Sequence, residues 1–123
     1  MTVEGEPWPS LTIEGSGAIA APLTLHVKAQ AGDRVLMLAA DRFDKRIVAG
    51  IGGFPLFAVP GGTFFFVVPV GTIGPTGQLD ITLNIPDNPA AIGQVGVFQA
   101  LATPSSGGTP MLSNMVVEIL RDK

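Results

Sequence analysis

The sequence contains no cysteine, and its 123 residues include one histidine, one tryptophan and no tyrosine. Without cysteine the chain has no disulfide framework, no thiol nucleophile and no cysteine-ligated zinc. Charged residues make up only 14% of the chain, whereas a typical soluble domain has about 25%. The formal net charge is −3 with seven basic residues. The chain therefore lacks the basic surface of a nucleic-acid-binding protein, and no nucleic-acid partner is expected.

Long apolar runs are missing as well. No segment has 18 consecutive apolar residues, so we expect no membrane span. The chain does not open with the charged and apolar regions of a secretion signal. The composition is compatible with a cytosolic protein and equally with the mature form of an exported one.

The sequence also lacks a convincing catalytic constellation. A Ser–His–Asp group needs a base beside its nucleophile, but His26 lies on the polar side of an alternating stretch and no GxSxG motif occurs. The acidic pairs Asp41 with Asp44 and Asp80 with Asp87 are typical of turns and solvated loops. Neither "GIGG" nor "PGG" continues into the Lys-Ser/Thr helix of a phosphate loop. We predict a non-enzyme with no cofactor and no metal ion; a small hydrolase that joins His26 to a carboxylate or serine is the less favoured alternative.

Short apolar stretches separated by turn residues make up most of the chain. Hydrophobic residues account for 46%, and 16 glycines and 11 prolines punctuate them. Apolar and polar residues alternate in several stretches, which is typical of half-buried strands. We expect strands at 11–15, 23–30, 34–41, 56–59, 63–73, 78–86, 94–103 and 111–122. The pattern predicts an all-β fold, an antiparallel β-sandwich of about eight strands with Ig-like or jelly-roll topology and almost no α-helix. Residues 1–10 are interpreted as a lead-in and 11–123 as one domain.

Several local features refine this prediction. The turn at 31–33 suggests that 23–30 and 34–41 form a hairpin, with 34–41 as a central strand covered on both faces. Pro69 makes 63–73 an edge or bulged strand. In 86–93, Asn88 is a candidate N-cap before Pro89, which predicts one helical turn.

Gln99 is a polar residue in the middle of an apolar strand. It shares one face with Val95, Val97 and Leu101, so its amide is expected to be buried and must find hydrogen-bond partners. We expect these partners in the backbone of the 86–89 turn or at Asn114. Gln99 and Asn114 are interpreted as internal polar staples that fix loops to the sheet.

The second half of the chain resembles a known type of module. The order "GQLDITLNIP", "AAIGQVGVFQALAT", a glycine-rich loop and "LSNMVVEIL" resembles an uncharacterised β-sandwich module of exported planctomycete and myxobacterial proteins. The matching positions are Ile85, Pro86, Gly93, Phe98, Gln99, Ala100, Ser113 and Asn114. The resemblance covers about residues 15–120, and its specific part is limited to 77–120. It implies an extracellular or cell-surface location and carries no catalytic residues.

The apolar excess is the remaining clue to function. Mean hydropathy is +0.45, and a small domain buries a limited fraction of its surface. Exposed apolar patches usually mark association sites; the alternative, that all of these residues are core, stays open. The candidate interface residues are Phe54, Phe57, Phe64, Phe65 and Phe66. The sequence therefore predicts a structural or interaction module that self-associates as a homo-oligomer or assembly.

Two alternative functions remain. One is a carbohydrate- or small-ligand-binding sandwich that uses Trp8 and loop polar groups such as Asn88. The other is a viral or phage coat or decoration subunit, which has the same compositional signature.

Overall fold

The computed structural model describes residues 9–58 and 65–122, and this part of the chain is all-β, as the sequence predicts. One 3₁₀ turn, η1 (Pro89–Ala91), is the only helical element in these two ranges. The strands are β1 (Ser10–Glu14), β2 (Pro22–Lys28), β3 (Arg34–Ala40), β4 (Phe43–Arg46), β5 (Gly52–Gly53), β6 (Leu56–Ala58), β7 (Phe65–Thr72), β8 (Gln78–Asn84), β9 (Val95–Thr103) and β10 (Met111–Ile119).

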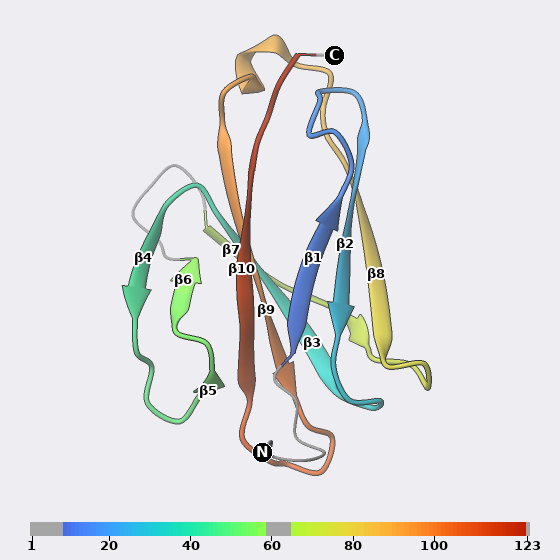
Figure 1. Cartoon of the computed structure of the whole chain (residues 1–123), viewed down its shortest axis with the longest axis vertical. Helices are drawn as coiled ribbons and strands as arrows, with labels where there is room; N and C mark the ends of the chain where they lie inside the picture. Colours follow the sequence, from blue (N-terminus) through green and yellow to red (C-terminus); the bar gives the residue numbers. More distant parts are fainter. Residues whose placement is uncertain (1–8, 59–64, 123) are drawn as a thin grey trace.

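The strands form three sheets in layers. A five-stranded sheet has the order β5-β10-β9-β3-β7, a three-stranded sheet the order β1-β2-β8, and β4 pairs with β6. Figure 1 shows β1, β2 and β8 on one side of β9 and β10, and β4 and β6 on the other. The five-stranded sheet is therefore the middle layer of the domain.

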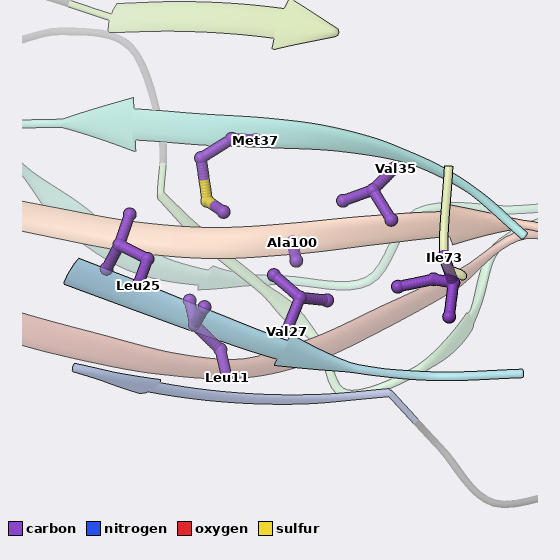
Figure 2. Close-up of a cluster of buried hydrophobic side chains, with 7 residues drawn as sticks. All are labelled: Leu11, Leu25, Val27, Val35, Met37, Ile73 and Ala100. Atoms are coloured by element: carbon purple, nitrogen blue, oxygen red, sulfur yellow. The ribbon is translucent and has the colours of Figure 1, made fainter. Parts of the chain in front are cut away.

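The two larger sheets enclose the first core cluster. β2 contributes Leu25 and Val27, and β3 contributes Val35 and Met37, with Ala100 of β9 between them. Figure 2 shows these side chains converging between the strands of the two sheets. All five are buried. Their burial follows from the two-residue period of a strand, which sends alternate side chains to the same face.

The opposite face of the middle sheet carries a second core cluster. Leu38 and Ala40 of β3 and Val97 of β9 pack there with Ala58 of β6. Thus β3 is buried on both faces, as its continuous apolar run predicts. A third, smaller cluster of Ile19, Leu23 and Ile85 closes the end of the sandwich beside η1.

The predicted hairpin between β2 and β3 is wrong. β2 pairs with β1 and β8, whereas β3 pairs with β7 and β9, so the two strands lie in different sheets. Their connection is held by the backbone around Ile73, whose carbonyl accepts from Gly32 N at 2.8 Å and whose amide donates to Asp33 O at 2.8 Å. Because the chain crosses from one sheet to the other between β2 and β3, the apolar side chains of the two strands face each other in one core. In a hairpin the two strands would instead lie side by side in the same sheet.

The remaining local predictions are confirmed, and one short strand was missed. η1 begins after Asn88, whose side chain accepts from Ala90 N at 3.0 Å. β7 is an edge strand with a register shift opposite Val35 and Leu36.

The sequence leaves residues 42–46 open as a loop or an edge element, and β4 lies there. β5 was not expected. A Cβ at Gly53 of β5 would collide with the backbone of Leu112, so glycine permits this close parallel pairing with β10.

We predict that Leu25→Ala lowers the free energy of unfolding by about 2–5 kcal/mol. The Leu25 side chain is fully buried in the first core cluster, so its truncation leaves a cavity between two sheets. Urea unfolding measures the change. Ile47→Ala is the control, because Ile47 is 79% exposed and its truncation should cost less than about 0.5 kcal/mol. Equal losses in the two variants would contradict the assigned core.

Candidate functional site

One side of the sandwich is open between the edge strands β7 and β8. The two strands are consecutive in the chain and come close where Gly71 approaches the side chain of Leu79, and they then diverge (Figure 1). Phe66 lies opposite Ala39 and Val68 opposite Met37, so both face the three-stranded sheet. In the described residues β8 is the last strand of that sheet, and the sheet does not cover the first half of β7.

The first half of β7 is both exposed and apolar. Phe66 is 56% exposed, Val67 49% and Val68 47%. All eight residues of β7 are uncharged. Val67 lies opposite Leu38, so it faces the side of the sheet that carries the second core cluster, away from Phe66 and Val68. The strand therefore presents apolar side chains on both faces at the edge of the sheet.

An apolar pocket lies at the wide end of this open side, with a volume of about 340 Å³. Leu23 and Ile85 are its buried walls, while Leu83 and Phe66 flank it from β8 and β7. Its other lining residues, from the end of β8, from β9 and β10 and from the adjoining loops, are Asn84, Pro86, Gln94, Val95, Gly96, Phe98, Glu118 and Leu120. Glu118 is the single ionisable group among them, and its Oε2 accepts from Arg121 Nη2 at 3.3 Å.

The predicted phenylalanine surface is divided by the structure. Phe66 is exposed, but Phe65 is half-buried against the second core cluster. Phe54 and Phe57 are also half-buried, beside and within β6. Phe64 lies outside the described residues. Val67 and Val68 complete the exposed surface; they belong to the uncharged "FFFVV" run that the sequence indicates, although the candidate interface residues named there are phenylalanines alone.

Gln99 is fully buried and makes four hydrogen bonds. Its Oε1 accepts from Phe57 N at 2.8 Å and Ala58 N at 3.3 Å. Its Nε2 donates to Pro55 O at 2.7 Å and Ser113 O at 2.8 Å. These partners lie in and beside β6 and in β10, so the expectation of partners in the 86–89 turn or at the Asn114 side chain was wrong. The amide instead fixes β6 onto the middle sheet.

Asn114 performs a similar task on the other side of β10. Its Oδ1 accepts from Leu11 N and its Nδ2 donates to Leu11 O, both at 2.9 Å. The side chain thus imitates a strand partner for β1. It lies at a bulge in β10, where Ser113 Oγ accepts from Ala100 N at 2.9 Å. Both amides therefore hold backbone segments together in the interior.

Of the two residues predicted for ligand contact, Trp8 lies outside the described residues. Asn88 caps η1 and is not among the residues that line the apolar pocket.

His26 lies on the solvent face of the three-stranded sheet between two carboxylates. Its Nδ1 is 2.7 Å from Asp80 Oδ1, and its Nε2 is 2.8 Å from Glu14 Oε1. An ionised carboxylate only accepts hydrogen bonds, so this arrangement favours the protonated, cationic form of the ring, in which both nitrogens donate. The hydrogen bond to Asp80, followed by that to Glu14, raises the pKa of His26, and the His26 bond lowers the pKa of Asp80. Both ring nitrogens are thus engaged by carboxylates, and the cluster is an ion-paired feature of the surface. Among the described residues, no three or more His, Cys, Asp or Glu side chains are arranged so that they could hold a metal ion.

Comparisons with family models, with curated proteins and with solved structures found no match to this chain. Within the described ranges, none of the helical structure has the length and apolar character needed to cross a membrane.

We predict that Gln99→Leu lowers the free energy of unfolding by roughly 3 kcal/mol or more, because each buried backbone group left unpaired costs about 1–3 kcal/mol. Amide exchange at Phe57 and Ala58, which lose their acceptor, should accelerate most. Urea unfolding and hydrogen exchange measure both effects. Gln94→Leu is the matched control at an exposed glutamine; similar losses for the two variants would refute the role given to Gln99.

The His26 cluster predicts a dependence of stability on pH. The folded-state pKa of His26 is raised, so its stabilising contribution is complete below the unfolded value of about 6.5 and disappears as pH rises through the folded value. The wild type should therefore lose more stability than His26→Gln between about pH 6 and pH 9. Urea midpoints at the two pH values measure this difference. A histidine NMR titration that gives a normal or lowered pKa would contradict the geometry.

Proposed function

We propose that this domain is a non-catalytic interaction module that self-associates through the edge strand β7, as a homo-oligomer or a larger assembly. The observation that carries the proposal is the exposed apolar run Phe66–Val67–Val68 on an uncharged edge strand. In the described part of the chain, β7 pairs only with β3. β7 is thus an edge strand, and edge strands are templates for pairing with a further strand.

The other edges of the sheets differ from β7. Asn114 occupies the backbone groups of Leu11 in β1, β5 has only two residues, and β8 carries the charged Asp80. Proteins protect their edges with charges, prolines and bulges. β7 has Pro69 and a bulge in its second half, whereas its first half has none of these features.

A second copy of this chain is the partner that fits β7. Two identical strands can pair antiparallel about a twofold axis, so that the same surface serves both subunits. Because β7 is uncharged, this pairing brings no like charges together along the strand. Apolar side chains on both faces of the strand would be removed from water on association.

The cellular setting is a separate proposal. An extracellular or cell-surface location rests on the resemblance to exported modules alone. A coat or decoration subunit would depend on self-association in the same way, so the β7 surface supports either setting.

Light scattering on wild type and Val67→Lys tests the proposal. Val67 is 49% exposed, so the folded monomer should tolerate lysine there, while a charge on the edge should block strand pairing. We expect a defined oligomer for the wild type and a monomer for Val67→Lys, with nearly unchanged unfolding midpoints. Phe65 is unsuitable for this test because it packs against the second core cluster.

Ile47→Lys is the matched control, since Ile47 is more exposed than Val67 and lies outside the strands. It should keep the mass of the wild type. A monomeric wild type at every concentration, or equal dissociation by both lysine variants, would refute association through β7.

A further inference from the structure

We propose that the apolar pocket between β7, β8, β9 and β10 binds an uncharged alkyl or aryl group of a small molecule. This inference does not rest on the proposed self-association, because it concerns the inner side of the sandwich and a different occupant. Three observations define the occupant. They are the apolar composition of the pocket walls, the volume of the pocket and the pairing of the Glu118 carboxylate with Arg121.

The walls of the pocket continue the hydrophobic core. Leu23 and Ile85 belong to the third core cluster, and Phe98 packs against it. The opening is marked by Leu83, which pairs with the buried Leu23 and so faces inward, yet is 36% exposed. An apolar ligand would therefore be in contact with core side chains on one side and with Phe66 on the other.

Gly96 shapes the base of the pocket. The side chain of Phe98 lies across this glycine, since a Cβ at Gly96 would be 3.0 Å from Phe98 Cε2 and 3.2 Å from Cζ. The backbone of Gly96 is not in the left-handed region that requires glycine. The missing side chain thus provides space, which is one of the reasons for glycine within a strand.

The charge of the lining selects an uncharged group. Among the described residues that line the pocket, Glu118 is the single ionisable one, and it is already paired with Arg121. A charged group placed among these walls would lose its hydration without gaining a free counter-charge. A sugar would similarly lose hydrogen bonds to water, because most of the lining is apolar. The carbohydrate alternative is therefore not favoured at this pocket.

The volume is sufficient for a ligand of modest size. About 340 Å³ lies at the lower end of the range of roughly 300–1,000 Å³ for small-molecule sites. An apolar cavity of about 150 Å³ already holds benzene in an engineered protein. A short alkyl chain or a fused aromatic ring system is the class of group that fits.

Titration with N-phenylnaphthylamine, an uncharged fluorophore that brightens in apolar surroundings, tests the inference. We expect a saturable fluorescence increase with the wild type. Leu83→Glu places a charge on the pocket wall and should weaken binding by about tenfold or more. Val117→Glu is the matched control, because Val117 is 41% exposed, is also in a strand and does not line the pocket; its affinity should stay within about twofold of the wild type.

Gly96→Ala is a second variant, without added charge, in case Leu83→Glu fails to fold. The new methyl group pushes the Phe98 ring toward the pocket and should also weaken binding. Displacement of the probe by decanol would identify an alkyl group, and displacement by naphthalene an aryl group.

Four results would overturn the inference. They are the absence of saturable binding, displacement by neither competitor, equal weakening by Leu83→Glu and Val117→Glu, and loss of binding in Val67→Lys. The same titration with Val67→Lys separates this pocket from the association surface. Unchanged binding there supports the pocket whatever the oligomeric state, whereas loss of binding would assign the probe to the β7 interface.

Discussion

Apolar side chains cover both faces of the five-stranded sheet, so each face needs a layer of its own. β3 shows this most clearly, since Val35 and Met37 pack under the three-stranded sheet and Leu38 and Ala40 pack on the opposite side. The layer on the first side has only three strands and leaves the first half of β7 exposed. This difference in width accounts for the exposed edge strand and for the opening beside it, so the candidate site is a direct consequence of how the core is covered.

The layer on the second side is small, and hydrogen bonds have to hold it. β6 has three residues and β4 has four, which is too little apolar surface to fix a two-stranded sheet by burial alone. Gln99 supplies the missing constraint from inside the core, because its amide satisfies three backbone groups of residues 55–58 and one of β10. A fully satisfied buried amide imposes one geometry. The polar residue in the apolar strand thus determines where the outer layer lies.

Sequence periodicity predicted the features that depend on a strand's own residues. The all-β class, the central position of β3, the irregular edge strand β7 and the capped turn at Asn88 follow from local patterns of this kind. The sheet to which each strand belongs does not follow from local patterns. By sequence alone β2 could have paired with β3, whereas in the structure the two strands lie in different sheets and face each other across the first core cluster. Coverage is also non-local: Phe65 and Phe66 are neighbours of the same type, yet packing against the second core cluster hides one and leaves the other in solvent.

The alternation of β7 keeps its two proposed roles separate. Phe66 faces the interior side and lines the pocket, whereas Val67 faces the opposite side of the sheet and does not. A ligand in the pocket is in contact with side chains on one face of the strand, while pairing with a second copy uses the backbone at its outer edge. Because successive side chains of a strand point to opposite faces, a substitution at Val67 can disturb association without entering the pocket. Phe66 is the residue that belongs to both surfaces, so it is the place to look for energetic coupling between ligand binding and association.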